Sequence, residues 1–529
     1  MSSELNHLVK QAAAGRLSRR EFVGRAGALG VSAAVAGTML ATAARAEAPV
    51  KGGRLRAGMG GGESTNTLDP ALAASEVPFV VSMTYGDMLV DVNPANEIDY
   101  RVAEEISSSP DAKEWKFKIR AGVEFHNGKT LTADDVVATL KRHTDEKSQS
   151  GALGIVKGIT GMKAAGDMVT LTLDAANADL PYLMADYHLV IQPGGGIDTP
   201  ADGIGSGAYK VTSFEPGVRI AFEKHANYWD NTVGHADQVE IIVINDNTAR
   251  TAALQSGQIN MMNRVDPKII GLLKGAPGIS VQSVAGRGHY VFIMHCDKPP
   301  YDNNDLRMAL KLAINRTELV DKILGGYGTV GNDFPINAAY PFFDETIPQR
   351  EMDAAKAVEF YKKSGHDGSP LILQVAEGAF PGAIEAAQLF QQSANAAGIP
   401  LEIKREPDDG YWTNVWNVAP FCASYWGGRP VQDQMYSTAY LSTADWNDTK
   451  FFDTAFDATL IAARGELDPV KRKAMYSEMA YKVRDTGGLI LPMFNDFVEI
   501  VADSLGGWQQ DPNGELMNGK ALVKCWLKA

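Results

Sequence analysis

The most informative stretch of this 529-residue sequence is Trp115-Lys116-Phe117-Lys118-Ile119-Arg120-Ala121-Gly122-Val123-Glu124-Phe125-His126-Asn127-Gly128. Its first five residues alternate between apolar and charged side chains, which is typical of a strand with one buried face. The run Val169-Thr170-Leu171-Thr172-Leu173 alternates in the same way. The sequence therefore predicts two half-buried strands in this part of the chain.

Helices and strands alternate along the rest of the chain, which predicts an α/β fold. The nearly continuous apolar run 239–244 predicts a buried strand, and a helix is expected at 248–256, closed by Gly257. Apolar residues recur at helical spacing over 305–324, where Asp305 is the expected cap and Gly325 the expected end. Further helices are predicted after Asp353, at 383–397 before Gly398, and after Asp468-Pro469.

The N-terminus carries an export signature. Ser18-Arg19-Arg20-Glu21-Phe22-Val23 has the twin-arginine pattern, and small apolar residues follow from Ala26 to Ala43. The small-x-small motif Ala44-Arg45-Ala46 predicts cleavage before Glu47. We therefore expect residues 1–46 to be a twin-arginine signal peptide and the mature protein to be periplasmic. A retained anchor helix is the alternative.

Composition excludes some classes of protein. The formal net charge is −14, and removal of residues 1–46, with six basic and two acidic side chains, makes it about −18. Such a surface argues against a nucleic-acid partner, because phosphates require a basic footprint. Cys296, Cys422 and Cys525 allow one disulfide at most. A mature chain of roughly 480 residues exceeds one hydrophobic core, so two or three lobes are expected.

The sequence resembles the extracellular solute-binding proteins of family 5, the group that contains dipeptide, oligopeptide and nickel binders. The resemblance covers nearly all of the mature chain, and its most specific part is the opening stretch followed by Leu131-Thr132-Ala133-Asp134-Asp135-Val136. The other matching motifs are Thr67-Leu68-Asp69-Pro70, Tyr85-Gly86-Asp87-Met88-Leu89, Gly205-Ser206-Gly207-Ala208-Tyr209, Asn227-Tyr228-Trp229, Leu306-Arg307-Met308-Ala309-Leu310 and Ala313-Ile314-Asn315-Arg316.

This resemblance implies a two-lobed periplasmic binding protein, a Venus flytrap, with an extra domain inserted in the first lobe. The implied first lobe comprises residues 47–94, 205–291 and 492–529, the insert 95–204, and the second lobe 292–491. Strands near 290–294 and 489–494 are expected to cross between the lobes. The implied function is capture of a small solute between the lobes for an ABC importer, whose permease and ATPase are the partners, by a protein that acts as a monomer.

Candidate solute contacts concentrate between Tyr411 and Arg429, a segment rich in aromatic residues that suit an organic solute. Trp416 and Phe421 are expected in the core instead. Ser64, Thr65 and Asn66, in a polar loop, are weaker candidates. The full set of predicted ligand-binding residues is Trp426, Gly427, Arg429, Tyr425, Trp412, Tyr411, Asp433, Thr65, Asn66, Phe494 and Asn495.

Arg429 departs from the pattern of the peptide-binding relatives, which carry an Asp a few residues after the Trp that aligns with Trp426. A guanidinium binds a carboxylate through two parallel hydrogen bonds. The hypothesis is that the solute is anionic, such as an opine or a sugar acid. In the alternative interpretation Arg429 forms a purely structural ion pair with Asp433.

An enzyme is the competing class of protein, as a hydrolase on the same fold, and a solute sensor or chaperone is a third. The sequence has no HExxH helix, phosphate-binding loop or Gly-x-Ser-x-Gly elbow. His289 and His295 would lie about 20 Å apart on a strand, too far for one metal ion. We expect no catalytic residues, metal site or cofactor.

Overall fold

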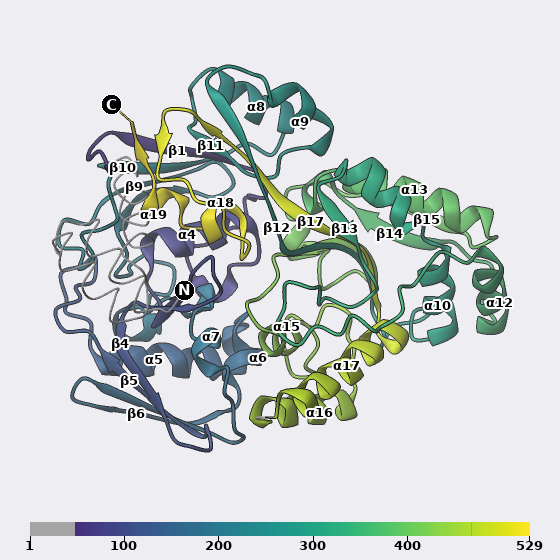
Figure 1. Ribbon diagram of the computed structural model, residues 1–529, viewed down its shortest axis with the longest axis horizontal. Coiled ribbons are helices and arrows are strands. Elements are labelled where there is room, and N and C mark those ends of the chain that lie inside the picture. The colour runs from purple at the N-terminus through teal and green to yellow at the C-terminus, as the bar shows by residue number, and fades with distance from the viewer. Residues whose placement is uncertain (1–47, 467, 529) are drawn as a thin grey trace, which may run out of the picture.

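The computed structural model describes residues 48–466 and 468–528, so the predicted signal peptide lies outside the described residues. Two apolar cores hold most of the buried side chains. One is built from residues between 55 and 261 with Val431 and residues 501–525, and the other from residues between 290 and 494. We call the parts around them the first lobe and the second lobe. They are the two masses of Figure 1, joined by the long strands β12 and β17.

These two strands, β12 (Ile279–Met294) and β17 (Leu489–Ala502), pair antiparallel at the centre of one sheet that passes through both lobes. They extend well beyond the crossing segments predicted at 290–294 and 489–494. On the first-lobe side the sheet continues through β11 (Met261–Met262), β1 (Arg54–Met59), β10 (Gln238–Val243), β9 (Arg219–Lys224) and β8 (Tyr209–Glu215). On the second-lobe side it continues through β16 (Phe421–Trp426), β14 (Leu371–Val375) and β15 (Leu401–Arg405), and β13 (Gly328–Val330) pairs with β17.

The register of β12 against β17 shifts between Ala285 and His289, near the middle of β12. Gly286 and Gly288 lie within this irregular segment. A Cβ at Gly286 would lie 2.5 Å from the Phe497 ring. Glycine is therefore required for the close approach of the two strands at this bend.

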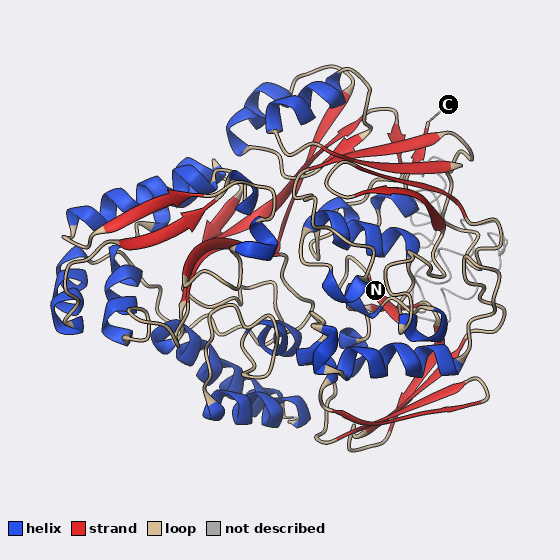
Figure 2. Ribbon diagram, turned by 180° about the vertical axis from the view of Figure 1, so that it is seen from behind, coloured by secondary structure: helices blue, strands red, loops and turns tan. Residues whose placement is uncertain are grey.

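The first lobe contains a separate four-stranded sheet, visible below the large sheet in Figure 2. Its order is β4 (Ala103–Ser108), β5 (Glu114–Ile119), β7 (Met168–Leu173), β6 (Ile159–Ala165), so both half-buried strands predicted from alternation are confirmed. The other elements of this lobe are α4 (Glu76–Tyr85), β2 (Val90–Val92), β3 (Ile98–Tyr100), α5 (Ala133–Thr144), α6 (Leu153–Val156), α7 (Leu180–Leu183), α8 (Asn247–Gln255), α9 (Pro267–Leu273), β18 (Leu505–Gly506), α18 (Glu515–Asn518), α19 (Ala521–Lys524) and β19 (Trp526–Leu527).

Helix caps set most boundaries in the second lobe. Asp353 caps α12 (Ala354–Ser364) and Asp468 caps α17 (Pro469–Thr486), as predicted. The predicted helix 305–324 is wrong in its cap and its continuity: α10 (Asn304–Ala313) is capped by Asn303, and α11 (Arg316–Leu319) follows a break. A π-helical turn over Val320–Leu324 continues α11 and ends at Gly325, as predicted. Asn315 causes the break, because its side chain accepts the Glu318 N–H and starts a new helix. The remaining helices are α13 (Ala383–Ala396), α14 (Tyr411–Asn414), α15 (Gln432–Ala439) and α16 (Thr454–Gly465).

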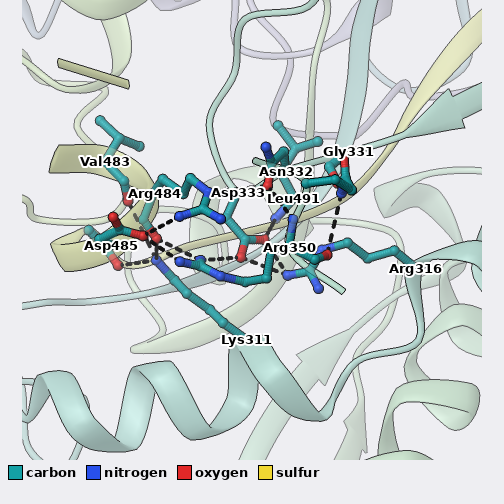
Figure 3. A network of polar contacts seen from close by, with 12 residues as sticks. Lys311, Arg316, Gly331, Asn332, Asp333, Arg350, Val483, Arg484, Asp485 and Leu491 are labelled. Atoms are coloured by element: carbon teal, nitrogen blue, oxygen red, sulfur yellow. Dashed lines mark hydrogen bonds and ion pairs between the residues drawn. The ribbon is translucent and has the colours of Figure 1, made fainter. Parts of the chain in front are cut away.

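A buried polar network joins α10, the end of α17 and the start of β17 (Figure 3). Asp333 accepts hydrogen bonds from Arg316 Nη2 at 2.7 Å and Arg350 Nη1 at 2.7 Å, and from the Leu491 N–H at 2.9 Å. Lys311 Nζ donates to the carbonyls of Arg484 and Gly487, both at 2.8 Å. The network thus pairs the last carbonyls of α17, which have no partner within the helix.

In the part of the chain that the structure describes, no helix is long and apolar enough to cross a membrane. Cys296, Cys422 and Cys525 are all unpaired thiols.

Candidate functional site

A cavity lies between the lobes, beside the bend of β12. Its empty volume is about 1140 Å³, including the open mouth. The first lobe contributes Ala74, Ser75, Glu76, Phe79, Met83, Val92, Tyr182, Ala185, Asp186, Tyr187, Arg264, Asn513, Gly514, Glu515 and Asn518. The strands β12 and β17 contribute Tyr290, Asn495 and Phe497, and the second lobe contributes Trp412, Trp416, Tyr425, Trp426, Gly427, Gly428, Arg429, Pro430, Gln434 and Trp446.

Four tryptophans form one wall of this cavity. Trp416 packs edge to face against Trp426 and Trp446, with ring centroids 6.3 and 5.3 Å apart, and Trp412 lies 6.1 Å from Trp416. The indole N–H groups of Trp416 and Trp426 both donate to Asp448 Oδ2, at 3.0 and 3.1 Å. This shared carboxylate fixes two of the rings. Burial raises the pKa of Asp448 to about 6.

Arg429 follows the end of β16 and reaches the cavity after Gly427-Gly428. Its side chain is 9% exposed, and its Nη1 donates to the Gly428 carbonyl at 2.7 Å. Nε has no hydrogen-bond partner; the nearest carboxylate oxygen, Asp186 Oδ2, is 3.8 Å away. The guanidinium therefore retains donors for a further acceptor.

Asp186 is held by other partners. His188 Nδ1 lies 2.5 Å from Asp186 Oδ1, and Gln434 Nε2 donates to Asp186 Oδ2 at 3.0 Å. Burial alone would raise the pKa of Asp186, but His188 and Arg429 outweigh it and lower the pKa to about 2. Asp186 is therefore ionised at neutral pH and already hydrogen-bonded.

Glu76, Arg264 and Glu515 come from three distant segments of the first lobe and meet at the cavity wall. Arg264 Nε lies 3.8 Å from Glu515 Oε2, and its guanidinium lies 4.1 Å from the centre of the Tyr425 ring. Glu515 also accepts a hydrogen bond from Asn263 at 2.8 Å. Glu76 has a longer contact, from the Tyr425 hydroxyl at 3.5 Å. Burial, with the neighbouring Glu515, raises the pKa of Glu76 to about 8.

The comparisons with known proteins agree with this geometry. The model of the bacterial extracellular solute-binding proteins, family 5, matches residues 97–448. The chain belongs to this family. Relatives include the di/tripeptide-binding protein 1 of Pseudomonas aeruginosa, 24% identical over 73% of this chain and 78% of its own length, and the periplasmic murein peptide-binding protein MppA of Escherichia coli, 24% identical over 87% and 88%.

Solved structures of family 5 proteins share the fold. The binding protein AgaA of Agrobacterium tumefaciens in complex with agropinic acid has a TM-score of 0.81 at 21% identity, over 90% of this chain and 99% of that one. The protein DppA of Helicobacter pylori in complex with the peptide STSA has a TM-score of 0.82 at 21% identity, over 91% and 99%. The α/β, two-lobed fold is thus confirmed, and the chain is a member of a family of solute-binding proteins rather than of enzymes.

Seven of the predicted contact residues of this family 5 protein are arranged around the cavity: Trp412, Tyr425, Trp426, Gly427, Arg429 and Asn495 line it, and Asp433 lies on α15 beside it. Asp433 itself is not part of the lining. It pairs with Arg464, Nε to Oδ1 at 2.7 Å, and so the alternative ion pair between Arg429 and Asp433 is not formed. Trp416, expected only in the core, is buried and also lines the cavity, whereas Phe421 belongs to the core.

The other predicted residues lie outside the lining. The Tyr411 hydroxyl donates to the Ala423 carbonyl at 2.8 Å, and Phe494 packs in the second core. Thr65 and Asn66 belong to a loop that contacts the opposite lobe: Thr413 Oγ1 donates to Thr65 Oγ1 at 3.0 Å. Asn66 supports this loop by accepting the Glu63 N–H at 2.8 Å.

Sequence reasoning missed the charged residues that the first lobe brings to the cavity, namely Glu76, Asp186, Arg264 and Glu515. Each is surrounded by ordinary helix or loop sequence, and 439 positions separate Glu76 from Glu515. The one available signal was the position of Glu76 shortly after the Thr67-Leu68-Asp69-Pro70 motif.

Proposed function

We propose that this family 5 protein is exported to the periplasm, encloses a small organic solute in the cavity between its lobes as a monomer, and delivers it to an ABC permease powered by an ATPase. The twin-arginine sequence and the periplasmic relative MppA support the location. The interlobe cavity supports the capture step, because contacts to both lobes favour the closed population. We place the lobe boundaries at 291/292 and 491/492, within β12 and β17, and the insert at 95–204.

The solute carries a carboxylate that Arg429 binds. The observation that carries this proposal is the buried guanidinium on the cavity wall, whose Nε has no hydrogen-bond partner and whose neighbour Asp186 is already occupied by His188 and Gln434. A planar fork of donors in a desolvated site suits a carboxylate. AgaA, a structural relative, was solved with agropinic acid, which is consistent with an acidic solute.

A thermal-shift screen of the mature chain from Glu47, stripped by unfolding and refolding, tests the proposal. The library contains peptides, opines, sugar acids and aromatic acids, each with a matched amide or ester that lacks the carboxylate. A solute that binds only the folded state raises the melting temperature. We expect shifts from carboxylates and not from their neutral partners.

Substitution of Arg429 tests whether this residue itself binds the carboxylate of the solute. Arg429→Ala should weaken binding of the best carboxylate by about 30-fold or more, because a buried charge loses its partner. Arg405→Ala, an exposed arginine on β15 away from the cavity, is the matched control. Unchanged affinity in Arg429→Ala contradicts the carboxylate assignment.

A further inference from the structure

The ionisable groups on the cavity wall are unevenly paired. Three carboxylates and two guanidinium groups line it. Arg264 faces Glu515 and Arg429 faces Asp186, each pair at 3.8 Å. Among the described residues, Glu76 forms no ion pair within 4.0 Å. Of the three lining carboxyl groups, Glu76 is therefore the one without an ion pair.

Glu76 is also poorly hydrogen-bonded for a buried carboxyl group. It is 8% exposed, and its contact is the Tyr425 hydroxyl at 3.5 Å from Oε2. Its position at the start of α4 gives some stabilisation of negative charge, since helix N-termini carry a partial positive charge. The helix N-terminus does not compensate for burial, which raises the pKa of Glu76. A ligand group that supplies positive charge and hydrogen-bond donors would stabilise the ionised carboxylate.

Two other side-chain oxygens on the cavity wall also lack a hydrogen-bond donor. Gln434 Oε1 and Asn495 Oδ1 are buried and have no hydrogen-bond partner, although the residues are only 2% and 5% exposed. The amide nitrogens are used: Gln434 Nε2 donates to Asp186 and Asn495 Nδ2 to the Asp496 carbonyl at 3.1 Å. These bonds fix the orientation of both amides and leave each side-chain oxygen without a partner. Both oxygens therefore need a hydrogen-bond donor.

The aromatic rings favour the same kind of ligand. Tyr187, Tyr425 and the four tryptophans line the cavity together with Phe79. Ring faces attract a cation, and more strongly when it is desolvated. Carboxylate, unpaired acceptor oxygens and aromatic faces thus all complement a positively charged nitrogen.

We propose that the solute bears a protonated or quaternary nitrogen that Glu76 binds, so that the ligand is a zwitterion with its cationic group at Glu76 and its carboxylate at Arg429. This inference rests on the proposed function, because it assumes that the interlobe cavity is the solute site. It assigns the recognition of charge to both lobes: Glu76 belongs to the first and Arg429 to the second.

Matched pairs of probes test this inference by isothermal titration at pH 7.5. One pair is alanylphenylalanine and N-acetylalanylphenylalanine; the second is phenylalanine and 3-phenylpropionate; the third is mannopinic acid and its N-acetyl derivative. Each pair shares its carboxylate and differs in the basic nitrogen. We expect at least one pair in which the wild-type protein binds the amine at least about 30-fold more tightly.

The variant Glu76→Gln is nearly isosteric and keeps the hydrogen-bond acceptor. It should abolish the preference for the amine and leave the affinity for the nitrogen-free partner unchanged. Glu402→Gln, on the exposed edge strand β15, is the control. Circular dichroism verifies folding, and the wild-type preference is a test that needs no variant.

Equal binding of both members of every pair, preference for the acetylated member, or no binding of any amine overturns the Glu76 assignment. So does an amine preference that Glu76→Gln retains. The two proposals fail separately: carboxylates that depend on Arg429 without any amine preference leave the proposed function intact. Amine binding that depends on Glu76 but not on Arg429 removes the carboxylate assignment alone.

Discussion

Glu76 and Arg429 reach the cavity for different local reasons. Glu76 is the first residue of α4 and lies beside Ser75, whose side chain is buried and unpaired on the same wall. Arg429 depends on the glycine before it. Gly428 has φ +84°, and a Cβ there would lie 2.4 Å from the Arg287 Cβ. A larger residue at 428 would move Arg429 away from the cavity.

At this scale Glu76 makes the stability of the unliganded protein depend on pH. Burial, with the charge of Glu515, raises the folded-state pKa to about 8 from an ordinary value of 4.5, against the lowering effects of Arg264 and the Tyr425 hydroxyl. Between these two pH values the unfolded chain has released a proton that the folded chain keeps. The free energy of unfolding therefore decreases as pH rises from about 4.5 to about 8, by about 1 kcal/mol per pH unit for one group.

Urea denaturation at pH 5, 6, 7 and 8 measures this effect. Glu76→Gln should remove part of the decrease, so that the variant gains stability over the wild-type protein as pH rises. If the free energy of unfolding of the two proteins changes with pH in parallel, Glu76 keeps an ordinary pKa.

At the scale of elements, Lys311 of α10 is expected to hold the end of α17 (Figure 3). Its fully buried Nζ donates to the carbonyls of Arg484 and Gly487, and more weakly to Val483 at 3.4 Å. Lys311→Met removes the donor of the buried Gly487 carbonyl, whereas the Arg484 carbonyl keeps a hydrogen bond from Arg350 Nη1 at 2.8 Å, and it should cost about 1–3 kcal/mol of unfolding free energy. Hydrogen exchange should accelerate in the last turn of α17. Lys471→Met, exposed on the same helix, is the control; an equal effect there would contradict this role.

Sequence patterns predicted elements well where the signal was local. Asp353 and Asp468 cap their helices, and alternation located β5 and β7. The break after α10 was missed because Ala313 and Ile314 fit the apolar stripe, while the side-chain hydrogen bond of Asn315 is visible only in the structure. The Trp426–Arg429 part of the site followed from one segment. The other half of the site, with Glu76 and Glu515, forms only when segments that lie far apart in the sequence pack together. No spacing pattern in the sequence predicts that contact.

At the scale of the whole molecule, a contact between loops joins the two lobes next to Trp412 of the cavity wall. Glu63 of the first lobe accepts the Trp412 N–H at 2.9 Å, and Ser64 Oγ donates to Asp409 of the second lobe at 2.8 Å. Glu63→Ala should therefore favour opening and release a bound solute about tenfold faster, since the lost bond involves a charged acceptor. Stopped-flow tryptophan fluorescence measures the release rate. An unchanged rate, with Glu97→Ala as control, would show that this contact does not hold the lobes together.

The decisive measurement is a crystal structure of the complex with the tightest ligand from the thermal-shift screen. We expect closed lobes, with the solute between them, its carboxylate on the Arg429 guanidinium and its basic nitrogen at hydrogen-bond distance from Glu76. A solute bound outside the interlobe cavity, or within it but with neither residue in contact, would contradict both proposals.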